Sequence, residues 1–113
     1  MRSPCKTNMS EIRIDDVRQK CNDGDLRWSE HIFKRFVKRG ITKADVVCAL
    51  NNGEIIEQYP DDYPYPSCLI LGFDVQDKYI HIVCGMGEPE LHLITAYYPN
   101  EWEWTDDFRI RKE

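Results

Sequence analysis

The sequence changes its periodicity at Glu54, and this change restricts the fold more than any other feature. Before Glu54 the apolar residues recur at helical spacing, whereas after it they alternate with polar residues or form short apolar runs. Helices and strands therefore occupy separate halves of the chain, which is typical of an α+β fold. A chain of 113 residues has the length of one domain. We predict a single α+β domain over residues 10–113, preceded by a tail over residues 1–9 that has no periodicity.

The first half predicts two or three helices. A weak helical pattern over residues 10–21 gives the first. The second begins at Ser29, a favourable N-cap, and Gly40 ends it. A further helix begins at Thr42, which forms a capping-box-like pair with Asp45. The second helix carries an apolar stripe at helical spacing, formed by Ile32, Phe33, Phe36 and Val37.

The second half predicts four strands joined by short connections, and hence a four-stranded antiparallel sheet. The expected strands cover residues 54–59, 67–75, 78–84 and 90–98. Residues 60–66 contain three prolines, which remove backbone donors and exclude regular structure. In the third strand, alternation places His81 on the face opposite Ile80 and Ile82.

The formal net charge of −5 argues against indiscriminate binding to nucleic acid, which depends on cationic side chains. The charges are nevertheless unevenly placed. Lysines and arginines are concentrated over residues 27–43, and Glu30 is the single acidic residue in this range. A local basic face on an acidic molecule is therefore compatible with the composition.

The cysteines and the apolar runs indicate a cytoplasmic protein. The count of five cysteines is odd and no two form a C-x-x-C pair, so neither a disulfide framework nor a zinc site is indicated. We expect all five to be reduced. Residues 1–10 lack the apolar run of a signal peptide, and no segment is apolar enough to cross a membrane. No cofactor fingerprint is present, and we expect neither a cofactor nor a metal.

The second helix is the first candidate for function. His31, Arg35 and Lys38 follow one another at i, i+4 and i+7 and so share a face, with Arg39 at its margin. Such a cationic row suits phosphate oxygens, since arginine makes planar two-pronged contacts with them. The alternative is a solvated helix face opposite the core.

The strands offer further candidates. His81 and His92 each lie within an apolar strand. Each can act as an acid or base, or it can be a sheet histidine whose hydrogen bonds are satisfied and that has no role in catalysis. Thr95 and Tyr97 lie at the end of the last strand, where hydroxyls can contact a ligand and aromatic rings can stack on unpaired bases. Ordinary packing of β-formers is the alternative there.

Several motifs follow one another from Ser29 to the end of the chain. They are His31-x-x-x-Arg35-x-x-x-Arg39-Gly40-Ile41-Thr42, the run from Gly53 to Glu57, the proline-rich run from Tyr59 to Ser67, the strand end from Thr95 to Pro99, Trp102, and Asp107-Phe108-Arg109-x-Arg111-Lys112. In this order they resemble a bacterial family known as domain of unknown function 4258. The resemblance covers about three quarters of the chain.

That family is similar to the RelE, BrnT and barnase-like ribonucleases, in which one or two helices precede a four-stranded antiparallel sheet. Its members also resemble toxins of toxin–antitoxin pairs, and a small zinc-finger antitoxin of the MqsA or YgiT type is often encoded beside them. The resemblance therefore implies an RNA-cleaving toxin with RNA as its substrate and such an antitoxin as its protein partner.

Cleavage by a metal-independent endoribonuclease proceeds through attack of the ribose 2′-hydroxyl on the adjacent phosphate. The protein must supply a base, an acid and positive charge on the phosphate. We assign these functions to catalytic residues His31, Arg35, Arg39 and Tyr97, and to substrate-binding residues Lys38, Thr95 and His81. The alternative is a non-catalytic protein-binding module that docks an acidic partner through the basic second helix. An enzyme of this kind needs His31 near Tyr97, whereas a binding module does not.

Overall fold

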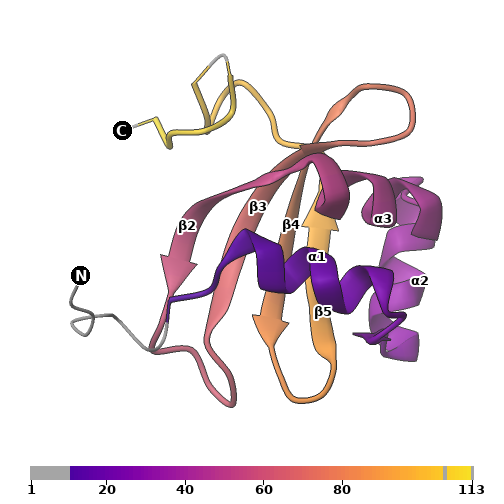
Figure 1. The fold of residues 1–113 in the computed structure, drawn as a ribbon. Coiled ribbons are helices and arrows are strands. Elements are labelled where there is room, and N and C mark those ends of the chain that lie inside the picture. The colour runs from indigo at the N-terminus through magenta and orange to yellow at the C-terminus, as the bar shows by residue number, and fades with distance from the viewer. Residues whose placement is uncertain (1–10, 106, 113) are drawn as a thin grey trace.

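The computed structural model describes residues 11–105 and 107–112. The predicted tail over residues 1–9 lies outside these ranges. In chain order the elements are α1 (Ile14–Asn22), β1 (Leu26–Arg27), α2 (Glu30–Arg39), α3 (Lys43–Asn52), β2 (Glu54–Tyr59), β3 (Ser67–Phe73), β4 (Tyr79–Met86) and β5 (Leu91–Tyr97) (Figure 1). The predicted α+β arrangement, with helices in the first half and the main strands in the second, is confirmed.

The helix ends form as their sequences predict. The Ser29 hydroxyl accepts a hydrogen bond from the Ile32 amide at 3.1 Å, which satisfies one of the free donors at the start of α2. Gly40 ends α2 with a φ of 73°, in the left-handed region that glycine adopts without strain. Thr42 and Asp45 form the complete capping box of α3, with each side chain accepting from the other residue's backbone amide.

The sheet has five strands in the order β1-β5-β4-β3-β2. Strands β2 to β5 pair with antiparallel neighbours, but β1 runs parallel to β5, with Leu26 opposite Leu91. The predicted four-stranded antiparallel sheet is therefore wrong in this detail, because the sheet is mixed. A two-residue strand has no alternation to detect. It forms because the end of α1 brings the Asp25 carbonyl to the Leu91 amide at 2.8 Å.

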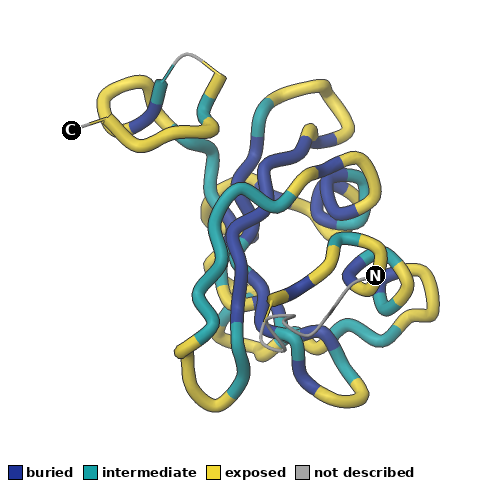
Figure 2. The backbone as a smooth tube through the Cα atoms, turned by 60° about the vertical axis from the view of Figure 1, so that its left-hand side comes forward, coloured by how far each residue is buried: buried dark blue, intermediate teal, exposed yellow. Residues whose placement is uncertain are grey.

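The hydrophobic core lies between the helices and one side of the sheet, which we call the first face. Figure 1 shows α1 crossing this face, and Figure 2 shows the buried backbone concentrated in the strands and in the adjacent sides of the helices. The fully or almost fully buried residues of this core include Val17, Phe36, Val46, Leu50, Ile70, Ile80, Ile82, Leu93 and Ala96. Asn52 links α3 to the end of β3 through two hydrogen bonds with the Phe73 backbone.

The apolar stripe predicted on α2 is only partly buried. Phe36 is 1% exposed and packs edge-to-face on Trp28 with ring centroids 5.4 Å apart. Phe33 and Val37, by contrast, are 52% and 60% exposed. Helix α2 lies at the β5 edge of the sheet rather than over its centre, so one flank of its stripe has no described element to pack against.

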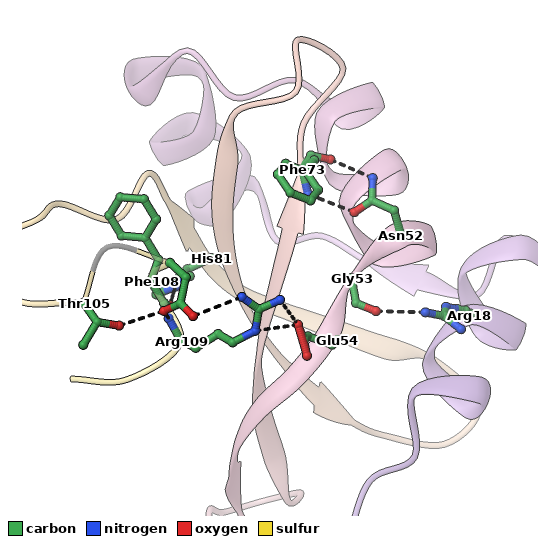
Figure 3. Close-up of polar contacts among 10 residues, drawn as sticks. Arg18, Asn52, Gly53, Glu54, Phe73, His81, Thr105, Phe108 and Arg109 are labelled. Carbon is green, nitrogen blue, oxygen red and sulfur yellow. Dashed lines mark hydrogen bonds and ion pairs between the residues drawn. The ribbon is translucent and has the colours of Figure 1, made fainter.

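The C-terminal segment (residues 99–112 without residue 106) covers part of the opposite side of the sheet, which we call the second face. Trp104 is 2% exposed there, and Phe108 packs edge-to-face on Tyr79 at 5.1 Å. Arg109 pairs with Glu54 of β2 (Figure 3). The segment is thus held by aromatic packing together with ion pairs.

The cysteines within the described ranges are free thiols, namely Cys21, Cys48, Cys68 and Cys84. Cys68 and Cys84 are opposite one another on β3 and β4, with their sulfur atoms 3.9 Å apart in the core. The contact with the Cys68 sulfur, together with burial, raises the pKa of the Cys84 thiol, so it stays protonated. Cys5 lies outside the described residues.

Candidate functional site on the second face of the sheet

A β-bulge decides which side chains of β5 reach the second face. Thr95 and Tyr97 are opposite Val83 and His81, but the register shifts before the next pair, in which Leu93 is opposite Cys84. Strict alternation would place residues 93, 95 and 97 on one face. Because of the bulge, Leu93 faces the core whereas Thr95 and Tyr97 face the other side, together with His81.

His81 and Tyr97 form a hydrogen-bonded pair on this face. His81 is completely buried, with Nε2 2.9 Å from the Phe108 carbonyl oxygen and Nδ1 3.3 Å from the Tyr97 hydroxyl; Figure 3 shows Phe108 beside it. A carbonyl only accepts, so Nε2 carries the proton and Nδ1 accepts from Tyr97. Burial lowers the pKa of His81 despite the Phe108 bond, which acts in the opposite direction. Burial also raises the pKa of Tyr97. At neutral pH the pair is therefore a neutral imidazole and a protonated phenol.

A second polar cluster adjoins this pair. Arg111 of the C-terminal segment donates to Glu57 of β2 at 3.0 Å, and the Tyr59 hydroxyl donates to the same carboxylate. Burial alone would raise the pKa of Glu57, but the hydrogen bonds from Arg111 and Tyr59 outweigh it and lower the pKa. Burial and the carboxylate raise the pKa of Tyr59 to about 12. The Arg111 guanidinium also lies over the Trp104 ring, 4.7 Å from its centroid.

Arg39 connects α2 to this face of the sheet. Its Nη1 donates to the Thr95 hydroxyl at 3.1 Å and to the Ala96 carbonyl at 2.7 Å. The Ala96 carbonyl belongs to the part of β5 that β1 leaves unpaired, so an edge of the sheet holds the guanidinium. Nε and Nη2 of Arg39 make no hydrogen bond within residues 11–105 and 107–112 and are available to a ligand.

An open groove of about 490 Å³ continues from Arg39 toward the turn between β3 and β4. It holds two cationic side chains, Arg39 and Lys78. Asp45 also borders it, but its carboxylate already accepts from the Thr42 and Val75 amides. The remaining lining residues are Gly40, Thr42, Val75, Gln76 and Tyr98. The groove can therefore accommodate an anionic group beside Arg39.

The predicted site residues thus fall into two groups. Arg39, Thr95, Tyr97 and His81 are brought together. The side chains of His31, Arg35 and Lys38 are exposed on α2, and none of them makes a hydrogen bond or ion pair in the part of the chain that the structure describes. The polar partner of Tyr97 is His81, not His31.

The sequence does not indicate four residues that contribute to the site. Glu57, Tyr59 and Arg111 form the second polar cluster, and Lys78 borders the groove. Glu57 and Arg111 lie in two of the motifs noted above, but 54 residues separate them. Nothing in their spacing indicates that they pair, because the C-terminal segment must first fold back over the sheet.

Two further properties concern metals and membranes. Among the described residues, no group of three or more histidine, cysteine, aspartate or glutamate side chains is positioned to hold a metal ion. Within the same ranges, every helix is too short or too polar to cross a lipid bilayer.

Comparison with known proteins identifies a family but no individual relative. No curated protein and no solved structure matches the chain. The sequence model of one family, described as "Domain of unknown function (DUF4258)", matches residues 28–98, which include α2, α3, the four main strands and the Arg39, Thr95, Tyr97 and His81 cluster. This match covers more than half of the chain, and the protein belongs to the DUF4258 family.

Proposed function

We propose that this protein is a metal-independent endoribonuclease that binds RNA beside α2 and cleaves it by attack of the 2′-hydroxyl. The observation that carries the proposal is the contact of Arg39 with Thr95, next to the Tyr97–His81 pair. It joins a cation with free donors to a residue pair that can accept a proton, and both are needed for this reaction.

Arg39 supplies positive charge for the phosphate. Thr95 and Ala96 fix its Nη1, so the guanidinium is already oriented when the substrate arrives. Its other donors bind the phosphate oxygens, on which negative charge grows in the transition state. Arg35 lies one helical turn before Arg39 and contacts a neighbouring phosphate, and Lys78 contacts another in the groove.

Tyr97 and His81 supply the base. The Tyr97 oxygen takes the proton of the 2′-hydroxyl while its own proton passes to Nδ1 of His81. The 2′-oxygen then bonds to phosphorus, the bond to the 5′-oxygen breaks, and that oxygen takes a proton from water. Until the hydroxide so formed takes it back through Tyr97, the extra proton stays on His81 as an imidazolium. Glu57 stabilises the resulting imidazolium, since its negative charge raises the pKa of His81. His81 stays buried throughout and acts through Tyr97.

The resemblance to toxins extends the proposal to the cell. We propose that the fold is RelE-like or barnase-like, that the enzyme acts as the toxin of a toxin–antitoxin pair, and that a small zinc-finger protein of the MqsA or YgiT type neutralises it. Helices preceding a sheet whose second face carries the polar cluster agree with that analogy. Expression without the antitoxin should then slow bacterial growth.

The direct test is cleavage of an end-labelled single-stranded RNA by purified protein in the presence of EDTA. Wild type should yield products with 2′,3′-cyclic phosphate ends. Tyr97→Phe removes the hydroxyl and keeps the ring, and should lower the rate about a hundredfold or more. Tyr79→Phe is the matched control, because Tyr79 lies on the same face and its hydroxyl makes no hydrogen bond within the described residues.

Two outcomes would contradict this account. Failure of the folded wild-type protein to cleave any RNA would exclude the enzyme. Loss of cleavage in His31→Ala together with full activity in Tyr97→Phe would move proton transfer to α2, as the sequence alone suggests.

A non-catalytic binding module is the second candidate. Two observations favour it. Phe33 and Val37 are exposed next to the cations of α2, and Tyr97 makes its hydrogen bond to His81 and not to His31. In that case the double charge reversal Arg35→Glu and Lys38→Glu should abolish binding of an acidic partner, and Tyr97→Phe should have no effect.

A further inference from the structure

The proline-rich loop over residues 60–66 forms an aromatic surface that the proposed reaction does not use. Tyr65 packs against His92 of β5, with ring centroids 5.0 Å apart and planes inclined by 60°. Tyr63 is 94% exposed, the largest exposure among the large hydrophobic residues of the described ranges. Together they border a small pocket of about 90 Å³, whose other lining residues are Asp62, Pro64, Gly85 and Ile94.

The pocket continues the second face of the sheet. Gly85 follows His81 and Val83 at intervals of two on β4, so all three share that face. Ile94 is the residue of the β5 bulge, directly before Thr95. At a rise of about 3.3 Å per residue, the three steps from His92 to Thr95 span about 10 Å along β5. A nucleic acid held at Arg39 and Thr95 can therefore reach the pocket with a nearby nucleotide.

The chemistry of the loop favours a base over a phosphate. Asp61 and Asp62 are exposed acids in the same loop and would repel the backbone of a nucleic acid. An aromatic ring, in contrast, stacks on any base because every base has a π face. The prolines restrict the loop, and the Ser67 hydroxyl donates to Asp62, so the rings are partly ordered before binding.

We propose that Tyr63, Tyr65 and His92 form a stacking site for one unpaired base, and that the substrate is therefore single-stranded RNA. In a duplex the bases are already stacked on one another and their faces are not accessible. This inference rests on the proposed function for the identity of the ligand, but it concerns binding and not proton transfer.

The test uses fluorescence anisotropy with a labelled single-stranded oligonucleotide of 2′-O-methyl RNA. Such RNA lacks the attacking hydroxyl, so binding is measured whether or not the protein is an enzyme. Tyr63→Ala should weaken binding about tenfold, the lower part of the range for the loss of one stacked base. Tyr63→Phe keeps the stacking ring and should bind as wild type does. At 94% exposure neither change should affect folding.

Trp102→Ala is the matched control, because Trp102 is also strongly exposed, at 84%, but belongs to the C-terminal segment. It should leave the affinity unchanged. A duplex of the same sequence should bind more weakly, and Tyr63→Ala should not alter that binding.

The results separate this inference from the proposed function. Equal effects of Tyr63→Ala and Trp102→Ala, or equal affinity for single strand and duplex, overturn the stacking site even if unmodified RNA is cleaved. If Tyr63→Ala weakens binding but unmodified RNA is not cleaved, the result supports the stacking site and contradicts the proposed ribonuclease activity. Binding of no oligonucleotide at all overturns both.

Discussion

The helices cover the first face of the sheet and the C-terminal segment covers part of the second, and the two faces are stabilised by different physical means. The first face meets the helices through aliphatic side chains such as Ile80, Ile82 and Leu50, with no charged partner among them. The second face buries His81 under Trp104 and Phe108. Polar side chains of this face pair across strands, as His81 does with Tyr97, or with the C-terminal segment, as Glu57 does with Arg111.

The difference has consequences for how each face responds to conditions. Burial of apolar area does not depend on protonation and is insensitive to moderate salt. The contribution of a buried imidazole to stability depends on pH, and that of partly exposed ion pairs depends on pH and on ionic strength. We therefore expect the first face to determine whether the chain folds, and the second to determine the conditions under which the C-terminal segment stays docked.

The largest expected effect comes from a cavity in the first face. Ile82→Ala removes buried methyl and methylene groups from the centre of the sheet and should lower the free energy of unfolding by about 3 kcal/mol. Urea unfolding monitored by circular dichroism measures this loss, which should be the same at pH 7 and pH 5. Ile110→Ala is the matched control, because Ile110 is 65% exposed, and its effect should stay below about 0.5 kcal/mol. A strong pH dependence of the Ile82→Ala loss would contradict the proposed difference between the faces.

A smaller effect should appear on the second face when the pH is lowered. The folded state resists protonation of His81, whereas the unfolded chain protonates it near the ordinary pKa of 6.5. Because the unfolded state then binds more protons, the free energy of unfolding should fall as the pH drops below about 6.5. The pKa of Glu57 is also lowered, but from 4.5, so its contribution should be lost in a separate and more acidic range.

Two histidine variants identify the source of this pH dependence. His81→Gln should remove the part of the slope between pH 6.5 and pH 5 in urea unfolding curves. His31→Gln, on the exposed side of α2, should leave the slope as in wild type. A slope that survives in His81→Gln would show that burial of this imidazole is not its cause.

The same comparison explains which parts of the molecule the sequence can predict. Helix ends depend on neighbouring residues, so Ser29, Gly40 and the Thr42–Asp45 box are all recognisable. Strand β1 and the bulge at Ile94 depend on partners far along the chain, and they leave no local signal. For this reason the parallel pair was not predicted, and simple alternation would have placed Thr95 and Tyr97 on the wrong face.

In the candidate site, too, the local features can be predicted from the sequence and the long-range contacts cannot. The cationic row of α2 follows from helical spacing alone, and so does the marginal position of Arg39 within it. The pairing of Arg39 with Thr95, of His81 with Tyr97 and of Glu57 with Arg111 joins residues 16 to 56 positions apart. Such contacts are products of the tertiary fold. Sequence therefore supplied several of the residues, but not the geometry that makes Tyr97 and His81 a better proton-transfer pair than His31.

The smallest expected effect concerns the ion pair that fastens the C-terminal segment to β2. Arg111→Gln removes the charge that faces Glu57 and keeps part of the side chain that covers Trp104. Since the Arg111 side chain is 59% exposed, the loss of unfolding free energy should be only about 0.5 kcal/mol, and it should shrink in 1 M salt.

The lost ion pair fastens the C-terminal segment, so this segment should loosen more than the rest of the domain. It should still stay docked, because Trp104 and Phe108 remain its main attachments. Hydrogen exchange of the Thr105 and Lys112 amides, which bond within the segment, should therefore accelerate in Arg111→Gln, whereas the Ile82 amide should exchange as in wild type. Equal acceleration at all three amides would mean that the segment and the core open together, and the two faces would then be one cooperative unit.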